Sequence, residues 1–219
     1  MIERYLSAVS VADASAEDLA GTRERLKDRF PRGSTRRMTQ LGLLIGAALD
    51  DLGLQTDDAV VYASAYAESR ALEAYLESFP SASPTLFQTS IHPSAVQQAL
   101  INRQHPIGEF FPFTGRAHLV GHAVQVALLS PARRVLLCGG EEKGTWLLDN
   151  KIASDRAFAF ALALTTDSTD AIGRVSLVSK PDLGATPEFS LPDFFDALVT
   201  RRPLDCAASP GLGLVLQWF

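Results

Sequence analysis

Residues 110–129 carry an apolar stretch, a turn and an amphipathic run, a pattern that presents a reactive side chain at a helix N-terminus in many enzymes. An apolar stretch leads to a Thr114-Gly115 break, and an amphipathic run with two histidines follows. In enzymes built this way, a cysteine or serine at the turn attacks the substrate. Here Phe113 and Thr114 occupy the turn. Phe113 has no nucleophilic group, and Thr114 would need a base beside it.

His118 and His122 are the nearest candidate bases, because they stand four residues apart on one predicted helix. Thr114 or Ser130, paired with either histidine, could hydrolyse or transfer an acyl group if hydroxyl and imidazole lay within roughly 3 Å. The same histidine spacing can bind zinc. However, Leu119 stands where a zinc protease carries its glutamate, and no third ligand is evident. We therefore expect both histidines to pack against the helix, and we expect no metal or cofactor.

The cysteines Cys138 and Cys206 show no metal-ligand spacing and are too few for a disulfide framework. Cys138 lies inside an apolar run, where a free cysteine behaves as a small hydrophobic side chain. Cys206 precedes the last predicted strand and has no amphipathic helix after it, so we do not expect a reactive thiol there. This cysteine usage predicts a protein of the reducing cytoplasm.

Composition indicates one globular domain over residues 1–219. The chain is 47% hydrophobic, which allows a sizeable core, and its net charge of −5 gives no electrostatic footprint for nucleic acid. No apolar run approaches the ~20 residues of a membrane-spanning helix. Glu3 and the serines near the amino terminus do not fit a secretory signal.

The order of predicted elements places the chain in the α/β class. Continuous apolar runs predict buried strands, and apolar side chains at helical spacing predict helices. Residues 38–53 are nearly all apolar, so we expect a buried helix that stops at Gly53. Ser15 and Asp18 form a capping-box pattern before the first helix. Predicted strands cover 5–11, 59–65, 133–140, 156–166, 173–180 and 211–219; predicted helices cover 19–30, 38–53, 68–79, 93–104, 115–129 and 191–201.

Four segments in order resemble the amino-terminal half of the β-ketoacyl synthases, which have the thiolase fold. They read "RRMTQLGLLIGAALDDLGL", "AVVYASAYAES", "LFQTSIHPSAVQQALINRQHPIGE" and "FTGRAHLVGHAVQVALLSPARRVLLCGGEE". The resemblance is strongest over residues 30–145, and the chain looks most like the short ketosynthase-like proteins of aryl-polyene and xanthomonadin pigment pathways. It implies a layered, thiolase-like half domain with a mixed central sheet and a buried helix.

The same resemblance implies a subunit without condensing activity. It puts Phe113 at the position of the synthase cysteine, with Thr114 and Gly115 beside it, and neither Phe nor Thr can replace a thiolate. A working synthase also brings histidines, or a histidine and an asparagine, from its carboxy-terminal half to stabilise the charge that develops on decarboxylation. This sequence has no histidine after His122. We therefore expect a role in fatty-acid or polyene synthesis other than condensation.

A catalytic β-ketoacyl synthase and an acyl carrier protein are the partners that the resemblance implies. Phe87, Ile91 and Val96 fall in the segment that would line a subunit interface. Candidates for docking an acidic carrier are Arg36, Arg37, Arg133 and Arg134. Two alternatives stay open: an independent acyl hydrolase or acyltransferase that uses the hydroxyls and histidines named above, and a homodimer that binds an acyl ligand.

Overall fold

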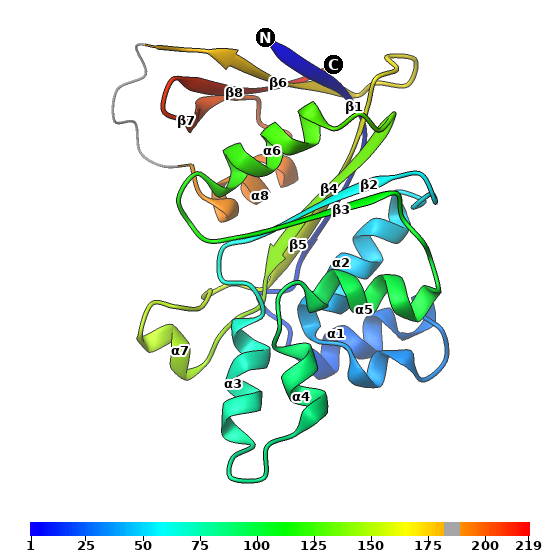
Figure 1. Cartoon of the computed structure of the whole chain (residues 1–219), viewed down its shortest axis with the longest axis vertical. Coiled ribbons are helices and arrows are strands. Elements are labelled where there is room, and N and C mark those ends of the chain that lie inside the picture. The colour runs from blue at the N-terminus through cyan, green and yellow to red at the C-terminus, as the bar shows by residue number, and fades with distance from the viewer. Residues whose placement is uncertain (182–188) are drawn as a thin grey trace.

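A computed structural model describes residues 1–181 and 189–219. In it, eight strands form one mixed sheet in the order β3-β2-β4-β5-β1-β6-β8-β7 (Figure 1). β2 pairs in parallel with β3 and β4, and the other neighbouring strands pair antiparallel. The strands are β1 (Ile2–Asp13), β2 (Ala59–Ser64), β3 (Glu109–Thr114), β4 (Arg134–Glu141), β5 (Phe158–Thr165), β6 (Gly173–Ser179), β7 (Leu204–Ser209) and β8 (Leu212–Trp218). The expected α/β class with a mixed central sheet is confirmed.

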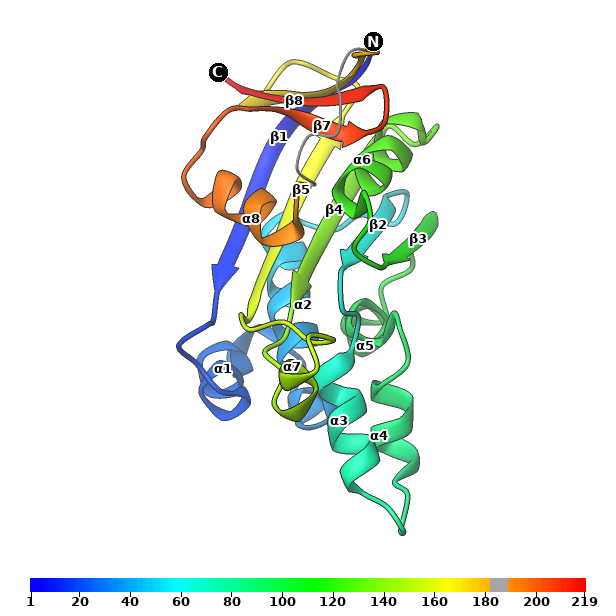
Figure 2. The same ribbon diagram turned by 90° about the vertical axis from the view of Figure 1, so that its left-hand side faces the viewer.

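Helices cover both faces of the sheet. One core cluster lies under α2, α5 and α1, and the other lies between the sheet and α6 and α8. Figure 2 shows that the part of the sheet formed by β6, β8 and β7 curls over α6 and α8. The helices are α1 (Leu19–Leu26), α2 (Gln40–Asp51), α3 (Ser69–Glu77), α4 (Pro84–Thr89), α5 (Ser94–Arg103), α6 (Leu119–Leu129), α7 (Trp146–Asp149) and α8 (Leu191–Val199), with 3₁₀ turns η1 (Lys27–Arg29) and η2 (Ser34–Arg37).

The centre of the sheet is buried on both faces. Every residue of β2 is buried, and β4 and β5 are buried except at one end, because helices pack on each side of them. This is why these strands read as continuous apolar runs. Since β2, β3 and β4 are parallel, their carboxyl ends meet at one edge of the sheet. The α3 and α4 helices project from this edge, away from both chain termini (Figure 1).

The predicted buried helix is α2. Its residues from Gln40 to Leu49 are all buried. The Thr39 hydroxyl accepts a hydrogen bond from the Gly42 N–H at 3.0 Å and caps the first turn. Gly53 follows the helix with φ +61°, a backbone conformation that favours glycine, as the sequence predicts.

Four features of the fold differ from the sequence predictions. The cap of α1 is Asp18, whose carboxylate accepts the Gly21 N–H at 2.7 Å, and Ser15 lies outside the helix. The strands β3 and β7 were not predicted, and they form the two edges of the sheet. Cys206 therefore lies within β7 rather than before a strand. The short helices α4 and α7 were not predicted either.

Among residues 1–181 and 189–219, none of the helices combines the length and the apolar character that crossing a bilayer requires.

The contact between α6 and β7 leaves no room for a side chain at Gly121. A Cβ at this position would lie 2.0 Å from the backbone oxygen of Ala208, which cannot move away as a flexible side chain could. Gly121→Ala should therefore lower the free energy of unfolding by about 1 to 3 kcal/mol, as overpacking does in other cores. Urea unfolding measures this change. Gln125→Ala, on the same helix, is the control and should stay within about 0.5 kcal/mol; equal effects would show that the close approach is not a constraint.

Candidate functional site

The turn from β3 to α6 is the position at which enzymes built this way carry a nucleophile. β3 ends at Thr114, and the chain reverses through Gly115 and His118, which have φ values of +114° and +54°. Phe113 is half-buried and packs against the core on the α6 side, while Thr114 is exposed. Residues 113–118 contain no thiol, and Thr114 is the only one of them with a hydroxyl group.

The helix after the turn begins four residues later than predicted. The predicted start was Gly115, but α6 starts at Leu119 because the left-handed backbone of His118 cannot continue a right-handed helix. His118 and His122 lie with their rings edge to face, 6.0 Å between centroids. His122 is exposed, so it does not belong to the core, although its ring lies against His118 of the same helix segment.

Ser130 lies too far from the histidines to be activated by them. It follows α6 at its carboxyl end, eight residues or roughly 12 Å along the helix from His122. Its backbone oxygen accepts a hydrogen bond from the Arg4 guanidinium at 2.5 Å, and its hydroxyl lies 3.4 Å from the Glu109 carboxylate. The hydroxyl and imidazole that a hydrolase would need are therefore not brought together at Ser130.

Two consecutive buried glutamates, Glu141 and Glu142, lie at the carboxyl end of β4, at the same end of the strands as the turn. Glu141 accepts hydrogen bonds from the N–H groups of Ala65 at 2.5 Å and Tyr66 at 3.3 Å, and from the Ser64 hydroxyl at 3.1 Å. Burial raises the pKa of Glu141 to about 8 against these hydrogen bonds. The backbone after β2 is thereby tied to the end of β4.

Glu142 binds the first turn of α2 in the same way. It accepts the N–H groups of Gln40 at 3.4 Å and Leu41 at 3.3 Å, and burial raises its pKa to about 7. Sequence reasoning missed Glu141 and Glu142 as site residues. The sequence places this pair directly after a continuous apolar strand, but nothing in the sequence distinguishes a buried pair from an exposed one there.

A third buried carboxylate joins α3 to α5. Glu68 is 3% exposed; it lies 3.0 Å from Nδ1 of His92 and accepts the Ala95 N–H at 3.1 Å. The His92 ring stacks on Tyr62 of β2, with 5.0 Å between centroids. The Tyr62 hydroxyl and Nε2 of His92 are buried and have no hydrogen-bond partner within the described part of the chain. Glu73 of α3 similarly holds the start of α7, because its carboxylate accepts a hydrogen bond from the Leu147 N–H at 2.7 Å.

A basic groove lies between α1, η2, α3 and α4 and has a volume of about 700 Å³. Its five cationic residues are Arg23, Arg36, Arg37, Arg70 and Lys143. Two of the four predicted docking arginines, Arg36 and Arg37, are among them and are exposed. The first turn of α2 and the buried Glu142 form one wall of this groove.

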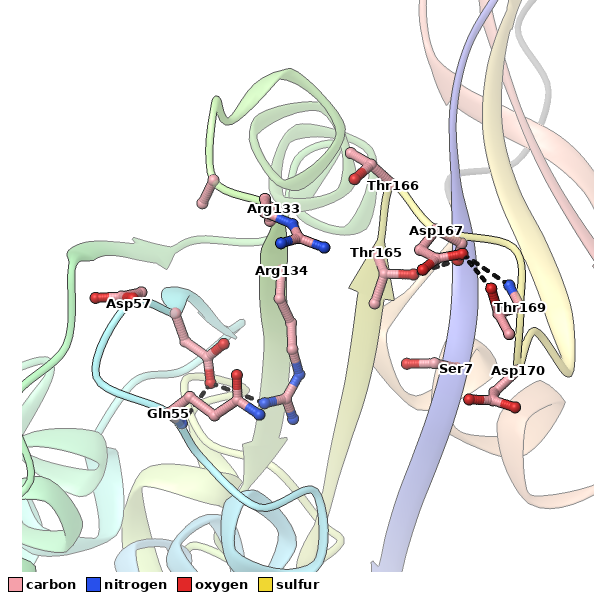
Figure 3. Close-up of a pocket in the computed structure, with 12 residues that line it drawn as sticks. Ser7, Gln55, Asp57, Arg133, Arg134, Thr165, Thr166, Asp167, Thr169 and Asp170 are labelled. Atoms are coloured by element: carbon pink, nitrogen blue, oxygen red, sulfur yellow. Dashed lines mark hydrogen bonds and ion pairs between the residues drawn. The ribbon is translucent and has the colours of Figure 1, made fainter.

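The other two predicted docking arginines lie in a separate pocket of about 660 Å³ (Figure 3). Arg134 donates to the backbone oxygens of Leu52 and Gly53 and pairs with Asp58 at 3.2 Å, so it secures the end of α2 rather than facing a partner. Arg133 is exposed, and four aspartates line the pocket around the two arginines. Because the two sites lie at opposite ends of the eight-residue β4, roughly 26 Å apart, the four arginines do not form one surface.

The three predicted interface residues also do not lie on one surface. Phe87 is 49% exposed and Ile91 is 48% exposed, which suits an interface. Val96 is fully buried against α2 and β2, so its assignment to an interface is wrong. Its place in the helical period turns it inward. Phe79, at the tip of the projecting α3–α4 hairpin, adds a further 55% exposed apolar side chain that sequence reasoning missed.

Neither cysteine is placed for chemistry. Cys138 is fully buried, and burial raises the pKa of its thiol. Burial also raises the pKa of Cys206 to about 11. Across residues 1–181 and 189–219, no group of three or more His, Cys, Asp or Glu side chains is arranged to hold a metal ion.

Comparison with solved structures identifies the fold, although no protein-family model and no curated protein matches the chain. A structure of the ketosynthase ApeO in complex with its chain length factor ApeC, from Xenorhabdus doucetiae, matches over 99% of this chain and 100% of that chain, with a TM-score of 0.70 and 16% identity. The ishigamide ketosynthase/chain length factor matches over 84% and 68%, with a TM-score of 0.57 and 12% identity. A β-ketoacyl synthase from Burkholderia phymatum matches over 85% and 67%, with a TM-score of 0.54 and 13% identity. The chain therefore has the thiolase-like ketosynthase fold.

Glu141 should make the protein less stable as pH rises. Its pKa is about 8 when folded against an ordinary value of 4.5, so the folded state binds this proton more tightly and the free energy of unfolding falls as pH rises between these values. The slope approaches about 1.4 kcal/mol per pH unit for one such group. Glu141→Gln should flatten the decline, as measured by urea unfolding from about pH 5.5 to about pH 8.5. Exposed Glu77→Gln is the control, and an unchanged slope in Glu141→Gln would contradict the assignment.

Proposed function

We propose that this chain is a ketosynthase-like subunit that does not condense, and that it works beside a catalytic ketosynthase in the synthesis of a fatty-acid or polyene chain of the aryl-polyene type. One observation carries the proposal: a ketosynthase fold whose strand, turn and helix present Phe113, Thr114 and Gly115. Condensation begins with a thiolate at a helix N-terminus that takes the acyl group from a thioester. No side chain of residues 113–118 can form one.

The character of the structural neighbours supports a paired subunit. The structure that matches over the whole of its chain is a complex of a ketosynthase with its chain length factor, and a second neighbour is a ketosynthase/chain length factor as well. A subunit of this kind contributes shape: it completes the walls around the growing chain while its partner performs the chemistry. The two free cysteines suit the reducing cytoplasm in which such assemblies work.

The projecting α3–α4 region is the surface that we assign to the partner ketosynthase. Phe79, Phe87 and Ile91 are each about half exposed, and the Tyr75 ring packs between Phe79 and Phe87 at 5.3 and 5.4 Å. Aromatic side chains held against one another in this way cost little entropy to bury on binding. Obligate interfaces bury on the order of 2,000 Å² or more. The rings of Tyr75, Phe79 and Phe87 form a contiguous apolar surface, which is more stable buried against a partner than exposed to water.

Arg36 and Arg37 are the side chains that we assign to an acyl carrier protein. Both are exposed on η2, and neither forms an ion pair within the described residues, so an acidic partner would not compete with an internal carboxylate. Arg134 is not part of this surface, because its guanidinium is bound to α2 and Asp58. Arg133 lies at the opposite end of β4, in the separate pocket, so it serves as a control for Arg36 and Arg37.

Thr114 should not become acylated. Incubation of the purified protein with acyl-carrier and malonyl-carrier thioesters should give no covalent acyl adduct by intact-mass spectrometry and no condensation product. Thr114→Ala should leave the product yield of the reconstituted ketosynthase pair unchanged, within twofold, because the residue makes no bond to substrate. Phe113→Cys should at most self-acylate slowly and should not condense. Acyl transfer to Thr114, or condensation by the chain alone, would refute the proposal.

Ile91→Asp should break the interface. We expect the wild-type chain not to be a clean monomer at micromolar concentration and to copurify with its catalytic ketosynthase, because the exposed apolar residues of α3–α4 need a cover. A charge at Ile91 should abolish copurification and leave the melting temperature of the isolated chain within a few degrees. Ile101→Asp is the matched control, since Ile101 is 73% exposed on the neighbouring α5.

Light scattering and copurification distinguish the outcomes of that experiment. A monomeric wild type that binds no ketosynthase, together with an Ile91→Asp variant of unchanged size, would remove the support for a paired subunit. A stable homodimer that excludes the ketosynthase would favour the homodimeric ligand-binding alternative instead.

A further inference from the structure

The cations of the basic groove are not neutralised by the carboxylates beside them. Arg36, Arg37 and Lys143 have no ion-pair partner anywhere in residues 1–181 and 189–219, and Arg23 donates only to the backbone oxygen of Thr35 at 3.1 Å. Arg70 pairs with the buried Glu73 at 3.2 Å. Four of the five cations therefore lack a carboxylate.

The three acidic residues of the groove are already engaged. Glu17 binds Arg25 at 2.9 Å, away from the groove cations. Asp18 caps α1 through the Gly21 N–H. Glu142 accepts the first two N–H groups of α2. The groove thus keeps an excess of positive charge that an anion from outside the chain would balance.

Beneath these charges the groove has an aliphatic lining. Its apolar side chains come from α1, α3, α4 and the residue after η2, and none of its described lining residues is aromatic. They are Leu19, Ala20, Met38, Ala71, Ala74 and Leu86. A volume of about 700 Å³ falls within the range of small-molecule sites. A flexible hydrocarbon chain fits such a lining better than a planar ring, which would seek an aromatic neighbour.

We infer that the basic groove binds an acyl or alkyl chain ending in an anionic group, with the chain on the aliphatic lining and the anion between Arg36, Arg37 and Lys143. The anion can be the carboxylate of a free fatty acid or the phosphate of an ester, since guanidinium groups bind both. This site concerns a free small molecule and does not rest on pairing with a ketosynthase or on docking of a carrier protein.

Calorimetric titration of the isolated full chain tests the site with five probes: octanoate, decanoate, octyl phosphate, inorganic phosphate and 1-octanol. Octanoate and octyl phosphate should bind, and the uncharged 1-octanol should bind at least tenfold more weakly. Decanoate should bind about tenfold more tightly than octanoate, because each buried CH₂ improves Kd by about fourfold at most. The tighter of the two eight-carbon anions identifies the source, carboxylate or phosphate ester.

Variants locate the binding within the fold. The double variant Arg36→Gln/Arg37→Gln should weaken octanoate at least tenfold, and Leu86→Ala should reduce the advantage of decanoate over octanoate. Arg133→Gln, an exposed arginine in the other pocket, should change neither. Circular dichroism melting confirms that each variant is folded, and exposed Arg36 and Arg37 leave no cavity when replaced.

Three results would overturn the inference: binding of 1-octanol as tight as octanoate, no effect of the double variant, or inorganic phosphate binding as tightly as octyl phosphate. Absence of binding by both anions would overturn it as well. Failure here together with copurification of a ketosynthase would leave the proposed function standing. Octanoate binding without any ketosynthase partner would support the groove as a binding site and contradict the proposed function.

Discussion

The fold depends on backbone N–H groups at the carboxyl edge of the sheet finding acceptors where water does not reach. Buried glutamates meet this need: Glu141 holds the chain after β2, Glu142 holds the start of α2, and Glu68 holds the start of α5. A buried donor left without an acceptor costs about 1–3 kcal/mol, so each carboxylate fixes the position of a separate element. The basic groove takes part of its shape from this arrangement, because Glu142 and Gln40 line it.

The ketosynthase fold does not by itself determine which side chains the turn before α6 presents. The chain has the ketosynthase fold at 12–16% identity to three solved structures, and its turn carries Phe113, Thr114 and Gly115. Burial of apolar side chains maintains the strands and α6 without regard to what the turn presents. Function must therefore be argued from the turn and the surfaces rather than from the fold.

The central elements were predictable because burial on two faces requires a continuous run of apolar residues, which can be recognised in the sequence. β2, β4, β5 and α2 are continuous apolar runs bounded by charged or glycine residues. The edge strands β3 and β7 were not predictable in this way: each pairs on one side only, their burial is interrupted, and Pro112 interrupts β3, which an edge strand tolerates.

The residue types of the candidate site could be predicted from the sequence, but the backbone conformation and the contacts around them could not. The types at the turn could be read directly, whereas its left-handed backbone at His118 depends on packing of the helix. The internal hydrogen bonds of Arg134 arise from neighbours distant in sequence. The glutamate pair could be recognised as buried only once α2 and the β2 turn were placed over it.

The position of β1 sets the order in which the molecule can assemble on the ribosome. β1 lies between β5 and β6, so its first residues pair with segments more than 150 positions later, such as Tyr5 with Thr165. At about 5–20 residues per second, the strand waits roughly 10 to 30 s for these partners to be synthesised. During that time β2, β3, β4 and α6 can associate, but β1 exposes both of its edges. Pairing between strands so distant in sequence is intrinsically slow, so the unpaired β1 leaves a nascent chain of this topology exposed to aggregation.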